Sequence, residues 1–217
     1  MRSPSAVRLL YSETRMINAT GFITAGGRSS RMGTDKAWLE LGGRAMIEQV
    51  IAALAPVISG LAIIANSLEY ARLGLPVFAD KQTGIGPLEA IRTALANSAT
   101  SRIVLVGCDL PFVTEDLFRF LLNIPGDHQA VVPVGADGKL EPLCAVYCAE
   151  VLPVVTDLIA RGERKVSLLF DPISTRFVPF DELRHLKGAD LFFENVNTPQ
   201  DYVRATENLL PRSRQTT

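Results

Sequence analysis

A short apolar run and the glycine-rich loop after it stand near the start of this chain, with the sequence GFITAGGRSSRMGTDK from Gly21 to Lys36. Phe22 and Ile23 predict a buried strand, and three glycines follow it. Glycine lets a backbone approach a ligand closely and adopt positive φ. Free N–H groups in such a turn bind anions, and three cations add positive charge, namely Arg28, Arg31 and Lys36. The segment therefore predicts a phosphate-binding loop behind a strand.

This loop differs from two common phosphate-binding motifs. A Walker loop has a lysine directly after its second glycine, whereas Lys36 comes three residues after Gly33. A dinucleotide fingerprint has Gly-x-Gly-x-x-Gly spacing, which the adjacent Gly26 and Gly27 do not supply. An ordinary glycine-rich surface loop is the plain alternative. The third glycine and the three cations, placed directly behind a strand, favour the anion site.

Length and composition indicate one α/β domain. The 217 residues are 47% hydrophobic and 21% charged, which is enough for a substantial core. A net charge of −1 gives no global field for nucleic acid or an anionic membrane, and no apolar run approaches the ~20 residues of a membrane helix. We therefore expect neither partner.

Three cysteines are an odd number, which argues against a disulfide framework and favours a cytoplasmic setting. Cys144 and Cys148 are expected to be buried thiols rather than zinc ligands. Residues 1–19 lack the alternating apolar pattern of the later sequence and are predicted to be a disordered tail, with Met16 as an alternative start. A single domain is expected over 20–210, and a second tail over 211–217.

Apolar runs alternate with helical patterns, which predicts a mostly parallel sheet covered by helices. A turn signal at Asp137-Gly138 predicts an antiparallel hairpin between two of the strands. The predicted strands are Gly21–Ala25, Leu61–Ala65, Val77–Ala79, Ile103–Gly107, Ala130–Val134, Leu143–Tyr147 and Phe192–Glu194. The predicted helices are Ala45–Leu54, Pro87–Ala96, Glu115–Leu122, Val151–Arg161 and Pro199–Leu209.

Polar residues follow four of these strands. They are the loop Thr24–Lys36, then Asn66, Asp80, and the pair Cys108-Asp109. Ligands of open α/β sheets bind outside the carboxyl ends of the strands, so these ends predict one site.

Asp109 is the candidate Mg²⁺ ligand, because Mg²⁺ binds one or two carboxylates together with phosphate oxygens. The alternative is a turn aspartate that caps the helix near Thr114. Lys36 is expected to stabilise charge on the phosphates, and its alternative is a solvated surface lysine. Arg31 is either a phosphate clamp or a structural partner of the loop.

These landmarks resemble the signature of molybdenum cofactor guanylyltransferases, also called molybdopterin-guanine dinucleotide biosynthesis protein A. The resemblance rests on motifs spread from about Gly21 to Leu209: Ala25-Gly26-Gly27-x-Ser29-x-Arg31-Met32-Gly33-x-Asp35-Lys36, Asp80, Gly86-Pro87-Leu88, Cys108-Asp109-Leu110-Pro111, Gly162-Glu163-Arg164-Lys165-Val166 and Asn195-Val196-Asn197-Thr198-Pro199. It implies a three-layer, Rossmann-like nucleotidyltransferase fold. The implied reaction is Mg²⁺-dependent transfer of GMP from GTP to molybdenum-loaded molybdopterin, with pyrophosphate released.

The resemblance also implies roles for single residues. Lys36, Asp109 and Arg31 are the expected catalytic residues, and Asp109 holds the metal. The expected nucleotide-binding residues are Thr24, Ala25, Gly26, Gly27, Lys36, Asn66, Asp80 and Asp109. The family often has an asparagine two positions before Asn66, where this chain has Ile64.

Asp80 is a candidate for guanine recognition, since a carboxylate accepts two hydrogen bonds from the guanine edge, or for positioning the nucleotide. Gly84–Pro87, which opens the predicted helix Pro87–Ala96, is either an anion-binding helix start or a simple junction. Arg164, Lys165, Asn195 and Asn197 are the expected pterin-binding residues, although Arg164 and Lys165 also fit a solvated face. Molybdenum-insertion and molybdoenzyme-maturation proteins are the expected protein partners.

Two other functions stay open. One is a nucleotidyltransferase of other specificity, such as cytidylyl transfer to the same pterin or transfer to a sugar phosphate. Related cytidylyl enzymes tend to have Ala-Ala-Gly where this chain has Ala25-Gly26-Gly27, which favours guanine. The other is a non-catalytic nucleotide-binding partner of molybdoenzymes. The presence of both Lys36 and Asp109 argues against it.

Overall fold

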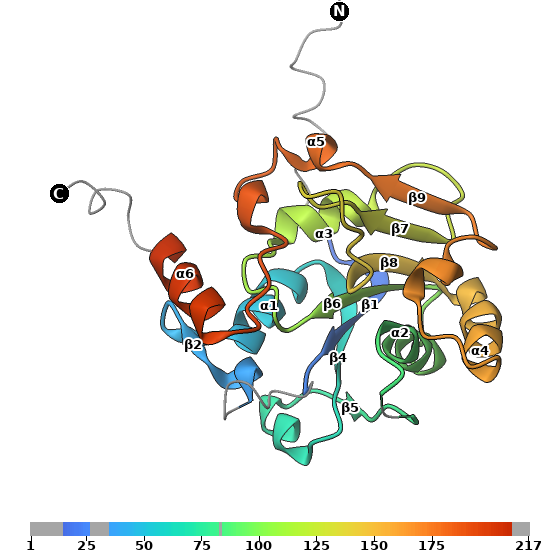
Figure 1. The fold of residues 1–217 in the computed structure, drawn as a ribbon, viewed down its shortest axis with the longest axis horizontal. Helices are drawn as coiled ribbons and strands as arrows, with labels where there is room; N and C mark the ends of the chain where they lie inside the picture. The colour runs from blue at the N-terminus through green and yellow to red at the C-terminus, as the bar shows by residue number, and fades with distance from the viewer. Residues whose placement is uncertain (1–14, 27–34, 83, 210–217) are drawn as a thin grey trace, which may run out of the picture.

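A seven-stranded sheet forms the centre of the molecule, with strand order β5-β4-β1-β6-β8-β7-β9 (Figure 1). The computed structural model describes residues 15–26, 35–82 and 84–209. Among the described strands, β8 alone runs antiparallel to its neighbours in the sheet. The strands are β1 (Ile17–Thr24), β4 (Ile58–Ile64), β5 (Val77–Phe78), β6 (Arg102–Gly107), β7 (Ala130–Pro133), β8 (Cys144–Cys148) and β9 (Thr175–Val178).

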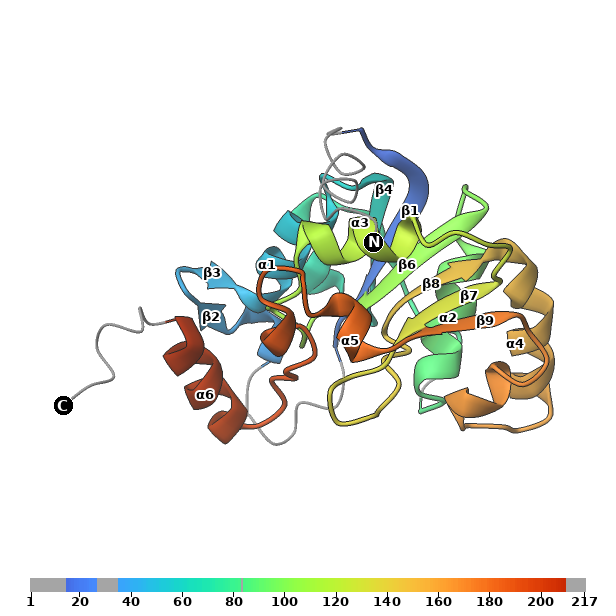
Figure 2. The same cartoon turned by 90° about the horizontal axis from the view of Figure 1, so that it is seen from above.

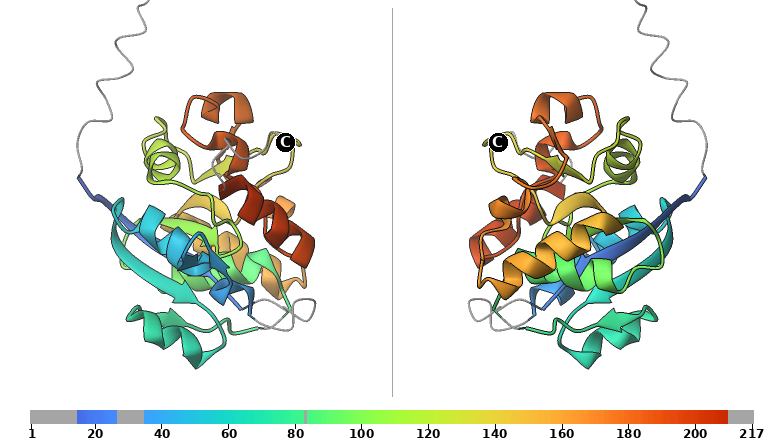
Figure 3. Two further views of the ribbon diagram at one scale, coloured as in Figure 1. Left: turned by 90° about the vertical axis from the view of Figure 1, so that its left-hand side faces the viewer. Right: turned by 90° about the vertical axis from the view of Figure 1, so that its right-hand side faces the viewer.

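Helices cover both faces of this sheet, so the predicted three-layer α/β fold is confirmed. One face packs against α1 (Met46–Leu54) and α3 (Glu115–Leu122), and the other against α2 (Pro87–Ala96) and α4 (Leu152–Ala160). The right-hand panel of Figure 3 shows α4 and α2 side by side. Successive strand residues point to opposite faces. The strand β1 shows this directly, with Ile23 in the α1 and α3 core and Phe22 in the α2 and α4 core.

Local sequence signals set the helix ends. Thr114 caps α3, and its hydroxyl oxygen accepts from the Leu117 backbone N–H at 3.4 Å. Pro87 occupies the first turn of α2, where a missing N–H costs nothing. The predicted bounds of α2 and α3 match the structure, and those of α1 and α4 match within one residue. No described helix is long and apolar enough to cross a membrane.

The predicted strand Phe192–Glu194 is wrong. These residues follow a short 3₁₀ helix, Ala189–Leu191, and their backbone hydrogen bonds are local. The Phe192 N–H donates to the Ala189 carbonyl at 3.2 Å, and the Glu194 N–H to the Leu191 carbonyl at 3.0 Å. Phe192 is fully buried, so its apolar character reflects packing against the core and not strand pairing. The seventh strand is β9, which pairs in parallel with β7.

Several other features differ from, or add to, the predicted elements. The strand β1 begins at Ile17, inside the segment expected to be a tail. A small antiparallel sheet of β2 (Glu40–Leu41) and β3 (Arg44–Ala45) and a short helix α5 (Phe180–Leu183) were not predicted. The predicted hairpin is confirmed as the antiparallel pair β7 and β8. Cys144 is buried as expected, whereas Cys148 is half-buried.

The C-terminal helix α6 (Pro199–Leu209) lies beside β2, so late and early parts of the chain meet (Figures 1 and 2). The Tyr202 hydroxyl donates to the Glu40 carbonyl at 2.5 Å. A small apolar cluster of Leu41, Met46, Val196 and Ala205 fills this junction. This contact carries the segment 195–198 to the carboxyl edge of the sheet.

Candidate active site

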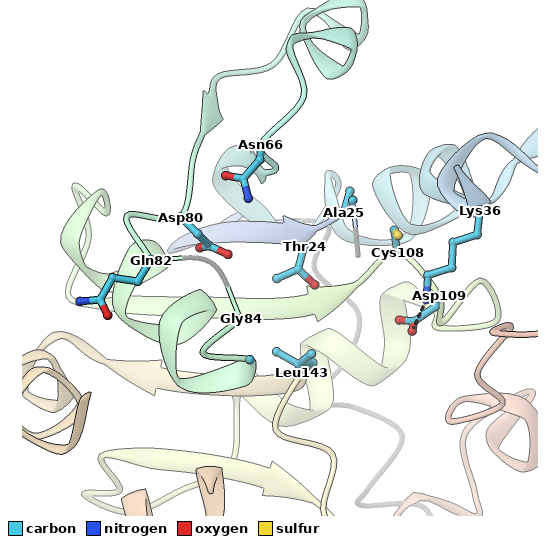
Figure 4. Close-up of a pocket in the computed structure, with 12 residues that line it drawn as sticks. Thr24, Ala25, Lys36, Asn66, Asp80, Gln82, Gly84, Cys108, Asp109 and Leu143 are labelled. Atoms are coloured by element: carbon cyan, nitrogen blue, oxygen red, sulfur yellow. Dashed lines mark hydrogen bonds and ion pairs between the residues drawn. The ribbon is translucent and has the colours of Figure 1, made fainter. Parts of the chain in front are cut away.

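A cavity of about 630 Å³ opens at the carboxyl ends of β1, β4, β5 and β6 (Figure 4). The strand ends are hydrogen bonded to one another: the Ala25 N–H donates to Ile64 and the Cys108 N–H to Thr24, both at 2.9 Å. The four strand ends therefore border one cavity, and its use as a binding site stays a prediction. The cavity is lined by Thr24, Ala25, Gly26, Lys36, Asn66, Asp80, Gln82, Gly84, Gly86, Cys108, Asp109 and Leu143.

One end of the cavity carries Lys36, which begins a short 3₁₀ helix, Lys36–Trp38. Its ammonium donates to Oδ2 of Asp109 at 2.8 Å and to Oδ1 of Asn197 at 2.7 Å. The Lys36 and Asp109 side chains are only 16% and 22% exposed. Partial burial weakens screening by water and salt, so this ion pair is stronger than a surface pair. Residues from three distant parts of the chain thus meet at one cationic centre.

The side chain and the backbone of Asp109 are each placed by a neighbouring residue. A Cβ atom on Gly107 would lie 2.3 Å from Asp109 Oδ1, so only glycine leaves room for this side-chain position. The Val196 N–H donates to the Asp109 backbone carbonyl at 2.9 Å. Thr114 caps α3 by itself, so the structure does not support the alternative role of Asp109 as a helix cap.

The oxygens at this end fit a magnesium ion. Asp109 Oδ2 and Asn197 Oδ1 both point at one cation position, which the Lys36 ammonium takes in this structure. Mg²⁺ binds oxygen, and one or two carboxylates suffice when nucleotide phosphates supply further ligands. Among the described residues, no group of three or more His, Cys, Asp or Glu side chains forms a complete metal cage. The arrangement suits an ion that arrives with a nucleotide.

The other end of the cavity carries Asn66, Asp80 and Gln82 (Figure 4). Asp80 Oδ1 accepts from the Thr93 hydroxyl at 2.8 Å, which fixes the carboxylate on α2. Burial raises the pKa of Asp80, and the Thr93 hydrogen bond opposes this shift. Gly84 and Gly86, at the start of α2, also line the cavity. Gly86 has a φ of 82°, a conformation that favours glycine.

A buried carboxylate supports this end from behind. Glu89 is 1% exposed, and it accepts from the Gln82 N–H at 3.1 Å and from Nε of Arg92 at 2.9 Å. These bonds tie the segment after Asp80 to α2. The Asp80 carboxylate and the backbone of Gln82 are therefore both held against α2.

A second cavity of about 420 Å³ lies beyond the segment Glu141–Leu143. Its lining includes the aromatic side chains of Phe180 and Phe193, together with Asn195 and Glu141. Burial raises the pKa of Glu141 to about 7, and the negative charges of Asp137 and Asp109 add to the shift. Asn197 contacts Lys36 at the first cavity and Asn195 lines the second, so one short segment joins the two.

Most of the predicted nucleotide-binding residues lie together. Thr24, Ala25, Gly26, Lys36, Asn66, Asp80 and Asp109 all line the first cavity. Gly27 and Arg31 lie outside the described residues. Arg164 and Lys165 are exposed between α4 and the 3₁₀ helix Val166–Leu169, and they line neither of the two cavities.

Sequence reasoning missed several residues of the site. Gln82 and Leu143 line the cavity, and Gly107 makes room for Asp109. Tyr70 donates its hydroxyl proton to Asp35, next to Lys36, across 35 positions of sequence. Gln82 had a usable signal, because it follows a strand end closely. The contacts of Gly107 and Tyr70 depend on tertiary packing and have no local signal.

Comparisons with known proteins agree with this geometry. The family model described as the MobA-like NTP transferase domain matches residues 21–172. A probable molybdenum cofactor guanylyltransferase of Carboxydothermus hydrogenoformans is 37% identical over 189 residues, covering 87% of this chain and 95% of that protein. The molybdenum cofactor guanylyltransferase of Yersinia pestis is 36% identical over 189 residues, covering 85% of this chain and 93% of that protein.

Solved structures share the fold. Molybdopterin-guanine dinucleotide biosynthesis protein A from Archaeoglobus fulgidus superposes with a TM-score of 0.74 at 24% identity, covering 87% of this chain and 97% of that one. A 2-C-methyl-D-erythritol 4-phosphate cytidylyltransferase from Thermus thermophilus gives a TM-score of 0.66 at 17% identity, covering 88% of this chain and 98% of that one. At these identities the likeness concerns the fold alone.

The fold, the strand-end cavity and these matches together define a nucleotidyltransferase. More narrowly, the chain belongs to the MobA-like NTP transferase family, whose model matches most of its length. The resemblance found in the sequence is thereby confirmed, since relatives named molybdenum cofactor guanylyltransferase align along 85% or more of the chain.

Proposed function

We propose that this chain transfers GMP from GTP to the terminal phosphate of molybdenum-loaded molybdopterin, forming molybdopterin guanine dinucleotide and pyrophosphate. The observation that carries the proposal is the meeting of Lys36, Asp109 and Asn197 at one end of the strand-end cavity. The names of relatives at 36–37% identity support the choice of substrates.

In the proposed complex, GTP lies along the first cavity. Asn66 and Asp80 receive the guanine and ribose end, and the backbone of Thr24 to Gly26 borders the phosphates. An oxygen of the acceptor phosphate attacks the α-phosphorus, and the bond from that phosphorus to the bridging oxygen of pyrophosphate breaks. Lys36 stabilises the negative charge that builds on the leaving pyrophosphate. No covalent enzyme intermediate is needed, because such transfer depends mainly on positioning and electrostatic stabilisation.

Magnesium dependence is part of the proposal. Asp109 would hold the ion, with Asn197 as a nearby oxygen donor. When bound, Mg²⁺ supplies positive charge that neutralises the phosphate oxygens. Binding of the ion by Asp109 would require its hydrogen bond with Lys36 to open, which would leave the ammonium free for the phosphates.

The acceptor is expected on the side of the second cavity. Asn195 and Asn197 span the two cavities, and Arg164 and Lys165 stay candidates for the pterin phosphate. We also propose that this protein is cytosolic and that it contacts molybdenum-insertion and molybdoenzyme-maturation proteins. The three free thiols agree with a reducing compartment.

A nucleotide panel tests the proposal. Pyrophosphate release is measured with GTP, CTP, ATP and UTP, each with and without molybdenum-loaded molybdopterin. We expect release with GTP and acceptor together, and dependence on added Mg²⁺. Asp109→Asn should reduce turnover by about a hundredfold or more. The matched control is Asp157→Asn, an exposed carboxylate paired with Arg161 on α4, which should keep full turnover. Preference for CTP would overturn the guanine assignment.

A further inference from the structure

We propose that Tyr70 is a positioning residue of the triphosphate site, whose hydroxyl holds Asp35 and thereby fixes Lys36. The Lys36 ammonium bonds to Asp109 and Asn197, whereas the Tyr70 hydroxyl bonds to Asp35, the residue before Lys36. The inference rests on the proposed nucleotidyl transfer, and it adds a residue that the sequence did not indicate.

The first step is the bond between Tyr70 and Asp35. Tyr70 lies on the 3₁₀ helix Leu68–Leu73, which follows β4, and its side chain is fully buried. Its hydroxyl donates to Asp35 Oδ2 at 2.6 Å, a length typical of a charge-assisted hydrogen bond. Burial, followed by the hydrogen bond to Asp35, raises the pKa of Tyr70 far above its ordinary value. The hydroxyl therefore stays protonated and stays the donor.

The second step leads from Asp35 to Lys36. Asp35 is the N-cap of the 3₁₀ helix Lys36–Trp38, and its Oδ1 accepts from the Ala37 N–H at 3.1 Å. One carboxylate oxygen thus fixes the helix that bears Lys36, and the other is fixed by Tyr70. A displacement of about 1 Å at a reacting group can cost on the order of a hundredfold in rate. The orientation of this short helix therefore affects how well Lys36 is placed for the reaction.

The ring of Tyr70 packs between the helix that bears Lys36 and the residues that follow β1. It stacks on Trp38, with ring centroids 5.2 Å apart and planes at 25°. The guanidinium of Arg72 lies over the other ring of this stack, 3.4 Å from the Trp38 centroid. A Cβ on Gly26 would lie 3.9 Å from Tyr70 Cε2, so the ring also borders the end of β1. Replacement by phenylalanine keeps the stacking and removes only the hydroxyl.

A double-mutant cycle on nucleotide binding tests the inference. The dissociation constant of Mg²⁺–GTP is measured by calorimetry for wild type, Tyr70→Phe, Lys36→Met and the double variant. Tyr70→Phe should weaken binding by about five- to tenfold in the wild-type background. In the Lys36→Met background the same change should alter the constant by less than about twofold. A merely structural role predicts the same fold-change in both backgrounds.

Tyr147→Phe is the matched control. Tyr147 is also fully buried and donates one hydrogen bond, to the Pro142 carbonyl at 2.9 Å. This variant should lose a similar amount of thermal stability and keep wild-type GTP affinity. If Tyr70→Phe fails to fold, Asp35→Asn repeats the cycle, since it keeps an acceptor for Ala37 and loses the carboxylate that Tyr70 binds.

The outcomes of the double-mutant cycle separate the inference from the proposed function. Loss of affinity that disappears in the Lys36→Met background supports the inference. Wild-type affinity in Tyr70→Phe, or equal fold-changes in both backgrounds, overturns the inference and leaves the proposed function intact. A wild-type chain that binds no nucleoside triphosphate overturns the proposed function and the inference together.

Discussion

Supporting residues that do not contact the substrate position the side chains of Lys36, Asp109 and Asn197. Gly107 is the clearest example, because it leaves space for the Asp109 carboxylate. Tyr70 and Asp35 act in the same way on Lys36. At the scale of single residues, supporting positions should therefore affect turnover as well as the groups that touch substrate.

Gly107→Ala should reduce turnover without unfolding the protein. The added methyl group would overlap Asp109 Oδ1, the end of a short side chain that is able to rotate away. We expect pyrophosphate release to fall by roughly tenfold or more. Gly60→Ala is the control, since the nearest atom to its added Cβ is 3.8 Å away on Thr20. Equal turnover in the two variants would contradict the assigned place of Asp109.

Glu141 should make the stability of the free protein depend on pH. Its pKa is raised from an ordinary 4.5 to about 7 by burial, so the folded state binds the proton more tightly than the unfolded state. The unfolding free energy should therefore decrease as pH rises from about 5 to 8. After allowance for solvent screening we expect a loss of about 1 kcal/mol.

Glu141→Gln tests this directly. Urea denaturation of wild type and variant at pH 5.5 and pH 8 should show that the variant loses this part of the pH dependence. It should also be the more stable of the two at pH 8. A wild-type protein whose stability increases across this window, with no difference from the variant, would contradict the prediction.

At the scale of elements, α6 is the support of Asn197. Asp201 Oδ2 accepts from the Asn197 N–H at 3.1 Å and from the Thr198 N–H at 2.8 Å, while the Thr198 hydroxyl accepts from the Asp201 N–H. These reciprocal bonds form a helix cap. The same few residues therefore begin a helix and aim a side chain at Lys36.

Asp201→Ala should lower both stability and turnover. We expect a cost of about 1 kcal/mol in the unfolding free energy, as for other lost caps, and a turnover that falls because Asn197 loses its anchor. Thr114→Ala removes the cap of α3, so it should cost similar stability with normal turnover. Turnover that simply follows stability in both variants would show that the α6 cap has no part in the site.

Helices with clear start signals were easier to predict from the sequence than edge strands and turns. Helix α3 begins after the capping residue Thr114 and α2 begins at Pro87, and both have a regular apolar face, so their predicted bounds match the structure. The edge strand β9 was missed because its residues carry little apolar signal, with Phe177 exposed and Val178 buried. Phe192 was assigned to a strand because it is apolar. A buried turn residue and a buried strand residue are both apolar, so this property does not separate the two.

At the scale of the whole molecule, the site was predictable because the topology is simple. Parallel strands bring their carboxyl ends to one edge, so Asn66, Asp80 and Asp109 could be placed together from the sequence. The contact of Lys36 with Asn197 joins residues 161 positions apart. It requires α6 to pack beside β2, and that packing has no local signal. Supporting residues such as Tyr70 escaped prediction for the same reason.

In the proposed reaction, the Lys36 end of the cavity binds the phosphates of GTP during transfer of GMP to the pterin. The most direct test is one incubation with GTP labelled at the α-phosphate, molybdenum-loaded molybdopterin and Mg²⁺, followed by separation of the products. We predict that the label appears in molybdopterin guanine dinucleotide with wild-type protein and not with Asp109→Asn. Label that stays in GTP with correctly folded wild-type protein, or dinucleotide formed equally well by the variant, would contradict this role of the site.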